Sequence, residues 1–291
     1  MFAIVGAAGK VGTSTAMVLR QAGHPVRAIV RDVAKAGPLQ AIGCEILQAD
    51  LQYPDALTQA ITGATAVQII VPPIPTAQDI VDDMHTSINS LVEALSRAQP
   101  QLVVAISDYG AHVEQDIGMP SVFRNFEARL REVPIPRVIL RSAEHMEGWA
   151  PLIPVAMATG TLPSLHHPLT ARFPTISAHD LGIISADLLR RPNLTDGEQL
   201  VQAEGPRRYS ANDVAMALGA LIGKPIAAVE LPRPAWQETL EKIASPSTAS
   251  LLVDLYDAHN RGQVDAEPNA GEMRYGTTAL IDALRPLIPA A

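Results

Sequence analysis

The residues best suited to chemistry at the start of this chain are three glycines, Gly6, Gly9 and Gly12, which follow a short apolar run. A buried strand that turns sharply into a helix needs residues without side chains at the turn. The unpaired N–H groups and positive dipole end of that helix can then meet a phosphate at close range. The G-x-x-G-x-x-G spacing, placed in the first β–α unit, therefore predicts a dinucleotide-binding turn.

A second group of chemical interest, Arg31, Asp32 and Lys35, follows the second apolar run. In dinucleotide folds a carboxylate at this place accepts from the ribose 2′-hydroxyl of NAD, whereas Arg accommodates the 2′-phosphate of NADP. Arg31 occupies the position that distinguishes NADP from NAD. Lys35 lies one helical turn further on and is able to reach the same phosphate. Asp32 could serve a hydroxyl instead, and a solvated surface pair is a third interpretation. We predict NADP, with NAD as the alternative.

The elements that must position these groups alternate between strand and helix patterns. Short, nearly continuous apolar runs are typical of strands covered on both faces. They predict strands at 2–5, 26–30, 45–47, 66–71, 102–106 and 137–140, with helices at 10–22, from 80 onward and at 121–131. Thr76 is predicted to cap the long helix that begins near Ile80. The alternation predicts an α/β fold built on a doubly wound parallel Rossmann sheet.

The pattern changes after Trp149, where prolines crowd residues 151–174 and predict loops. A strand–helix pattern resumes at 176–189, followed by a strand at 199–203, a helix from Ser210 to Gly223 and a strand at 226–231. We expect a cofactor domain over 1–147 with a return segment at about 174–190, and a smaller substrate-binding lobe from 148–173 and 191–291. The site would lie in the cleft outside the carboxyl ends of the strands.

Composition argues against several classes of protein. The chain has 291 residues, of which 47% are hydrophobic and 18% charged, enough for a buried core. Its formal charge of −8 argues against a nucleic-acid surface. No stretch approaches the ~20 apolar residues of a membrane span, and the apolar start reads as a strand rather than a signal peptide. A lone cysteine, Cys44, fits a reducing cytoplasm, where we expect the protein.

The motifs in this order resemble the NmrA-like family of atypical short-chain dehydrogenases/reductases, over nearly all of the chain. The resemblance implies an NAD(P)-binding Rossmann fold. It rests on Gly6–Gly12, Val26–Asp32, Gln48–Leu57, Ala105–Ala111, Val138–Glu147 and Ile176–Asp180.

The resemblance also implies roles for individual residues. Asp50 and Leu51 would lie beside the adenine, Ser107 would approach the nicotinamide, and residues 143–146 would wrap over its ring. Val71, Pro72 and Pro73 would line the ribose on the nicotinamide side. Other interpretations stay open, because Asp50 could cap a turn, the double proline Pro72-Pro73 could stop a strand, and Ser107 could bond to nearby backbone. The predicted cofactor site comprises Gly6, Ala8, Gly9, Lys10, Val11, Gly12, Arg31, Lys35, Asp50, Leu51, Val71, Pro72, Pro73, Ser107, Ala143, Glu144, His145 and Met146.

A conventional proton donor is missing from the sequence. No tyrosine is followed four residues later by Lys, so the Tyr-x-x-x-Lys pair of typical short-chain reductases is absent. Many members of the NmrA-like family carry His or Lys three or four residues before a Glu of the fifth helix. If Glu127 matches that Glu, the two positions here hold Arg124 and Phe123. Hydride transfer itself needs only orientation and exclusion of water, since the cofactor carries the chemistry. The predicted catalytic residues are Ser107, Tyr109 and His145, and the predicted substrate contacts are Tyr109, His145 and Trp149.

These features predict an NAD(P)H-dependent oxidoreductase that passes a hydride from NADPH to a small electron-poor acceptor, such as a quinone, azo compound or carbonyl. The alternative is a non-catalytic NADP-binding redox sensor that acts on a regulatory protein partner, and a homodimer fits either interpretation. No metal site is predicted, because His166 and His167 are adjacent rather than one turn apart and no cysteine cluster accompanies them.

Overall fold

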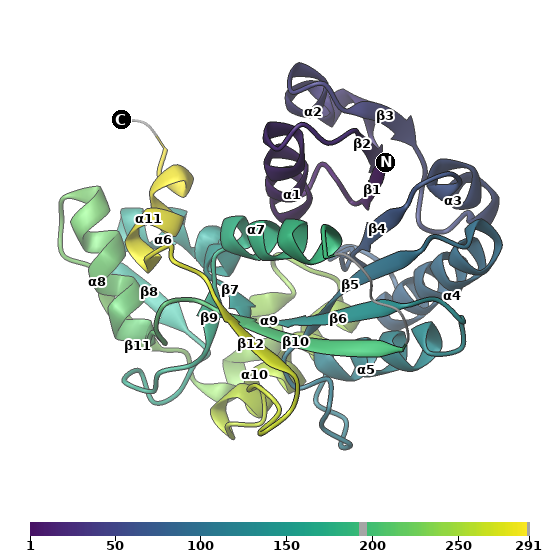
Figure 1. Ribbon diagram of the computed structural model, residues 1–291. Coiled ribbons are helices and arrows are strands. Elements are labelled where there is room, and N and C mark those ends of the chain that lie inside the picture. The colour runs from purple at the N-terminus through teal and green to yellow at the C-terminus, as the bar shows by residue number, and fades with distance from the viewer. Residues whose placement is uncertain (192–196, 290–291) are drawn as a thin grey trace.

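The centre of the fold is a parallel sheet of eight strands. The computed structural model describes residues 1–191 and 197–289 (Figure 1). The strand order is β12-β10-β6-β5-β4-β1-β2-β3, and all seven pairings are parallel. The chain runs outward in one direction through β1, β2 and β3 and in the other through β4, β5 and β6, so the order reverses between β1 and β4. Such a reversal leaves a crevice at the carboxyl ends of the strands. The predicted doubly wound sheet is confirmed.

The eight strands are β1 Phe2–Val5, β2 Val26–Val30, β3 Glu45–Gln48, β4 Ala66–Ile69, β5 Leu102–Asp108, β6 Arg137–Ser142, β10 Glu198–Glu204 and β12 Glu272–Tyr275. Two small parallel sheets pair β7 Glu144–His145 with β9 Thr175–Ile176, and β8 Thr161–Ser164 with β11 Ala227–Glu230. The helices are α1 Lys10–Gln21, α2 Gly37–Ala41, α3 Pro54–Ile61, α4 Ile80–Ala98, α5 Met119–Leu130, α6 Ile153–Thr159, α7 Ala178–Leu189, α8 Ala211–Ile222, α9 Trp236–Leu240, α10 Pro246–Asn260 and α11 Leu280–Leu284. Short 3₁₀ turns include η1 Val33–Lys35 and η2 Met146–Leu152.

The C-terminal part of the chain contributes both to the sheet and to a separate core. Strands β10 and β12 extend the central sheet beyond β6. The sequence had placed these residues in the smaller lobe, not in the sheet of the cofactor domain. The proline-rich segment at 151–174 was predicted as loops, but it contains helix α6 and strand β8, and β8 pairs with β11. Helices α8 and α11 pack with η2 around a second apolar cluster beside the sheet (Figure 1). The expected lobe boundaries stay a prediction, and residues 192–196 and 290–291 of that range lie outside the described residues.

Helix α1 packs closely against α7 and the sheet through small and polar residues. A Cβ added at Gly182 would lie 2.5 Å from Ser14 Cβ, so only glycine permits this approach of the two helices. Below them the buried Gln68 of β4 accepts hydrogen bonds from Thr15 Oγ1 at 2.7 Å and Ser185 Oγ at 2.6 Å. These contacts hold α1, whose first turn faces the ligand crevice, in a fixed position.

The cap of α4 differs from the prediction. Asp79, rather than Thr76, precedes the first helical residue, and its carboxylate accepts from the backbone N–H groups of Val81 at 3.0 Å and Asp82 at 3.1 Å. The expected Thr76 capping box is wrong because Asp79 itself meets the orphan N–H groups of the first turn.

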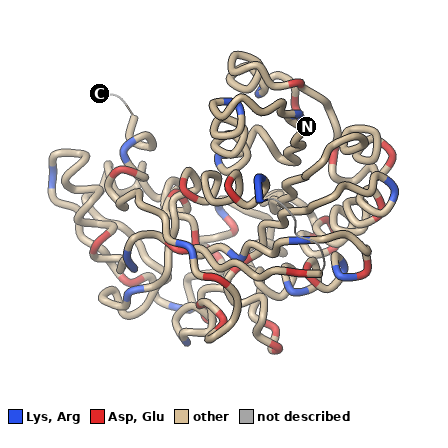
Figure 2. Tube along the Cα trace, viewed as in Figure 1, with Lys and Arg blue, Asp and Glu red and all other residues tan. Residues whose placement is uncertain are grey.

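Charged residues of both signs are interspersed along the fold (Figure 2). Most of their ion pairs involve side chains at least partly exposed to solvent, as between Arg97 and Asp55 or Arg233 and Asp257. Within the described residues, no helix is both long enough and apolar enough to cross a membrane.

Candidate cofactor and acceptor site

A cavity of about 740 Å³ opens at the carboxyl ends of the central strands. Its volume lies in the range typical of small-molecule and cofactor sites. The walls come from the turns that follow β1, β2, β3, β4, β5 and β6, together with Leu255 and His259 of α10. All the predicted cofactor residues except Met146 line this cavity.

The glycine turn forms one end of the cavity. Gly6 has φ +74, a conformation that L side chains rarely adopt, and a Cβ at Gly12 would lie 2.5 Å from the carbonyl oxygen of Gly6. Gly9 is the N-cap of α1 and offers no side-chain cap, and the first turn of α1 carries no acidic residue. The first-turn N–H groups and the helix dipole therefore point at the cavity without a competing side chain, which suits a diphosphate.

Two exposed cations lie at the neighbouring rim, after β2. Arg31 and Lys35 line the cavity, and so does Asp32. The Asp32 carboxylate caps η1, since Oδ1 accepts from the N–H of Ala34 at 3.0 Å. The other oxygen, Oδ2, can still accept a hydrogen bond from a ribose hydroxyl. Arg31 and Lys35, on the same rim, are cations that can bind a phosphate.

The loops after β3 and β4 form the middle of the cavity. Asp50 lines it together with Leu51, while Asp50 Oδ1 also accepts from the N–H of Gln52 at 3.1 Å. The interpretation of Asp50 as a turn cap is therefore confirmed, and its place on the cavity wall leaves the adenine role as a prediction. Pro72 and Pro73 line the cavity where the chain leaves β4.

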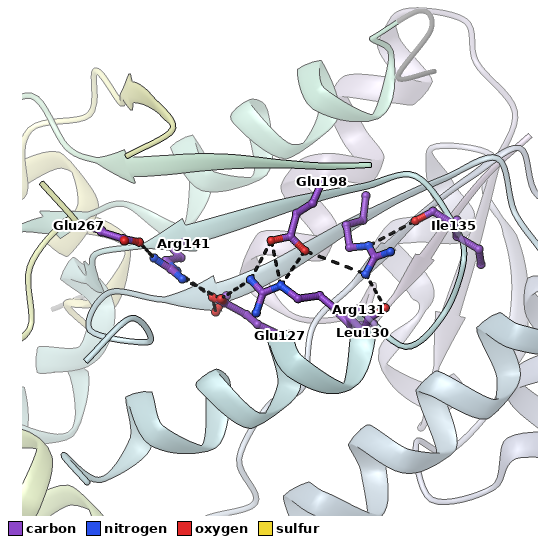
Figure 3. A network of polar contacts seen from close by, with 9 residues as sticks. Glu127, Leu130, Arg131, Ile135, Arg141, Glu198 and Glu267 are labelled. Atoms are coloured by element: carbon purple, nitrogen blue, oxygen red, sulfur yellow. Dashed lines mark hydrogen bonds and ion pairs between the residues drawn. The ribbon is translucent and has the colours of Figure 1, made fainter. Parts of the chain in front are cut away.

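Ser107 lies on the cavity wall, but its hydroxyl donates into a buried polar network. Figure 3 shows Glu127 and Arg141 of that network. Ser107 Oγ donates to Glu127 Oε1 at 2.7 Å, and Arg141 donates to both oxygens of Glu127, at 2.8 and 2.7 Å. Arg141 also pairs with Glu267 at 2.6 Å. Because the Ser107 hydrogen is already donated, this hydroxyl can accept a hydrogen bond from a ligand but is a poor proton source. The alternative that Ser107 bonds to nearby backbone is not what the structure shows.

Asp108, the next residue, is a group that sequence analysis missed. It lines the cavity at the end of β5. Burial raises the pKa of Asp108 to about 7, and the negative charge of Glu144 adds to this rise. A backbone hydrogen bond from Tyr109 lowers the pKa but does not offset the other two effects. A carboxyl group with such a pKa can donate or accept a proton near neutral pH.

Glu144, His145 and His259 line the same part of the cavity. Although burial by itself raises the pKa of Glu144, the imidazoles of His166 and His259 outweigh it and hold that pKa below its usual value. Burial lowers the pKa of His259 to about 4, so its ring is neutral at neutral pH. Burial also lowers the pKa of His145.

Three predicted site residues do not line the cavity. Tyr109 is fully buried, burial raises the pKa of its phenol, and its hydroxyl has no hydrogen-bond partner among the described residues. Met146 and Trp149 pack in the apolar core shared by η2 and α8. Their placement there follows from side-chain size: large apolar groups bury themselves beneath η2 rather than facing the crevice. Tyr109 and Trp149 are therefore not placed to contact a ligand in this cavity.

The positions counted from Glu127 also prove unsuited to proton donation. Phe123 adds an apolar surface to the cavity. The guanidinium of Arg124 donates to the backbone oxygens of Val113 and Gln115, the latter at 3.1 Å. His259 and Leu255 come from α10, more than a hundred residues after β6, and no local pattern in the sequence connects them to the site.

The profile of the NmrA-like family matches residues 1–269. The chain belongs to this family. A curated relative, the NAD(P)H azoreductase of Xenophilus azovorans, is 24% identical over 258 residues, covering 88% of this chain and 86% of the relative.

Solved structures show the same fold. An NADPH-dependent quinone oxidoreductase from Escherichia coli, complexed with NADPH, aligns with a TM-score of 0.79 at 20% identity, over 99% of each chain. The triphenylmethane reductase of a Citrobacter species, complexed with NADP(H), aligns with a TM-score of 0.79 at 19% identity, over 99% of this chain and 100% of the other.

Proposed function

We propose that this protein is an NADPH-dependent oxidoreductase that reduces small, electron-poor acceptors of the quinone or azo type. The observation that carries the proposal is a single cavity that joins two features. One side has the uncapped start of α1 and two cations, and the other side has Asp108, a carboxyl group able to exchange a proton near neutral pH. The relatives that are named as azo, quinone and dye reductases support the same class of acceptor.

The first-turn amides of α1 would bind the diphosphate, and Arg31 with Lys35 would bind the 2′-phosphate of NADPH. The bound cofactor supplies the hydride. The wall formed by Phe123, Val71 and Leu255 presents apolar surface to a flat acceptor and keeps water away from the reacting atoms. Asp108, with its pKa near neutrality, is the group placed to hold the proton that the reduced acceptor takes up.

The proposal is tested by following the absorbance of the reduced nicotinamide after NADPH is mixed with the protein and a quinone, an azo dye or an aldehyde. We expect turnover with at least one quinone or azo compound. The Gly9→Val variant, which fills the space needed by the diphosphate, is the matched control and should show no turnover. If NADPH binds tightly but no acceptor is reduced, the enzyme proposal is wrong.

The sensor alternative makes a different prediction. A redox sensor should change its association state between NADP⁺ and NADPH, which light scattering detects. A constant scattering mass with both cofactor forms, together with turnover, would leave the enzyme as the remaining interpretation.

A further inference from the structure

Three side chains from distant segments converge beside the cavity: Glu144 of β7, His166 after β8, and His259 of α10. Glu144 Oε2 lies 3.1 Å from His166 Nε2 and 3.5 Å from His259 Nε2. The side chains of both histidines are only 3% exposed. Sequence analysis considered His166 only with its neighbour His167, whereas the fold places it beside a carboxylate and a second imidazole.

Two polar atoms of this cluster lack the hydrogen bonds that burial normally requires. Glu144 Oε2 and His166 Nε2 have no hydrogen-bond partner among the described residues, although they lie 3.1 Å apart. Their contact therefore does not follow the direction in which an imidazole N–H donates. An unpaired buried polar atom is costly, so each one in a native structure calls for an explanation.

A metal ion explains both the spacing and the missing hydrogen bonds. Zinc binds His nitrogen and carboxylate oxygen at 2.0–2.2 Å in a tetrahedron, which separates neighbouring donor atoms by about 3.3 Å. The two distances from Glu144, 3.1 and 3.5 Å, lie on either side of that value. The candidate ligand atoms of all three residues lie within 4.8 Å of one another, close enough for a single ion to bind them together.

We propose that Glu144, His166 and His259 form a binding site for a divalent transition metal, with zinc as the best-suited ion. Two imidazoles and one carboxylate are a donor set that zinc uses where a fourth position stays open. Glu144 and His259 line the cavity while His166 is buried behind them, so the open position faces the cavity.

The surroundings of His166 hold its ring in place for this role. Phe173 stacks on the His166 ring with 3.7 Å between centroids and 10° between planes, and Tyr256 meets it edge-on at 5.0 Å. A ring held by aromatic neighbours on several sides cannot rotate away, and a ligand fixed in this way loses little freedom when a metal binds.

The open position fits an oxygen or nitrogen donor atom of a small acceptor, which the metal would polarise. This extension to the acceptor rests on the proposed function, but the metal site itself does not. The binding test below uses no NADPH and no acceptor, so its result is independent of whether the protein is a reductase.

The test treats the full chain with a chelator, removes the chelator, and titrates Zn²⁺ by calorimetry and Co²⁺ by visible absorption. We expect one ion per chain and cobalt bands of tetrahedral strength. Glu144→Gln and His259→Gln should each weaken binding by at least 100-fold. His85→Gln, which changes a histidine of α4 outside the cluster, is the matched control and should leave affinity unchanged.

Melting curves by circular dichroism show whether each variant is folded, and if one histidine variant is not, Glu144→Gln decides the test. Failure of the wild-type protein to bind either ion at millimolar concentration would overturn the proposal, as would unchanged affinity in folded Glu144→Gln. If the protein binds no metal but reduces an acceptor, the metal site is wrong and the proposed function stands. Metal binding without reduction would instead count against the proposed function.

Discussion

The buried pair of Glu127 and Arg141 gives the sharpest stability prediction. The two residues are 1% and 5% exposed, and two of the guanidinium nitrogens of Arg141 donate to Glu127 (Figure 3). Glu127→Met would leave Arg141 with only Glu267 as a partner and would remove the acceptor of the Ser107 hydroxyl. Breaking a buried ion pair costs about 3–5 kcal/mol, because the remaining charge stays out of water. The contact with Glu267 keeps the expected loss near ~3 kcal/mol.

The assay is urea unfolding of the wild type, both single Met variants and the double variant, with the free energy of unfolding extrapolated to water. Arg141→Met should cost a similar amount, since Glu127 then keeps only Ser107 and the long contact with Arg131 at 3.3 Å. The double variant should lose less than the sum by ~2 kcal/mol or more, because apolar side chains of similar volume can replace a buried pair at little cost.

A matched control lies at the end of the same helix. Glu132→Met removes the partner of Arg129, whose side chain is 36% exposed, and should change the free energy of unfolding by less than ~1 kcal/mol. Additive losses in the double variant, or single losses no larger than that of the control, would refute the argument that burial makes this pair important.

Three further predictions concern the cofactor turn, its rim and one helix cap. Arg31→Ala should weaken NADP⁺ binding by about 10- to 150-fold in calorimetry, the equivalent of a charge-assisted contact of roughly 1.5–3 kcal/mol, with little effect on NAD⁺; equal losses for both cofactors would show that Arg31 does not contact the 2′-phosphate. Gly9→Val should abolish binding of both cofactors, whereas the control Gly37→Val, where an added Cβ meets open space, should bind both normally. An unchanged binding titration of the Gly9→Val variant would contradict the role of the turn. Asp79→Ala should lower the free energy of unfolding by about 1 kcal/mol through loss of the α4 cap, while Thr76→Ala should not, and the reverse order would restore the capping box.

The amino-acid sequence by itself determined the cofactor half of this protein. The glycine turn, the cations after β2 and the residues after β3 and β4 all stand directly after apolar runs. In a parallel sheet the carboxyl ends of such strands meet at one edge, so local order in the chain is enough to bring these residues together. This explains why all the predicted cofactor residues but Met146 line the cavity.

Only the tertiary structure decided the other half of the site. Tyr109 and Trp149 have the right chemistry and lie beside predicted site residues, yet both side chains turn into apolar cores. His259 and His166 reach Glu144 from segments far away in sequence, through the packing of α10 and the loop after β8. Strand periodicity specifies which residues stand at an edge, but the direction of each side chain and the partners it meets depend on long-range packing, which no local pattern encodes.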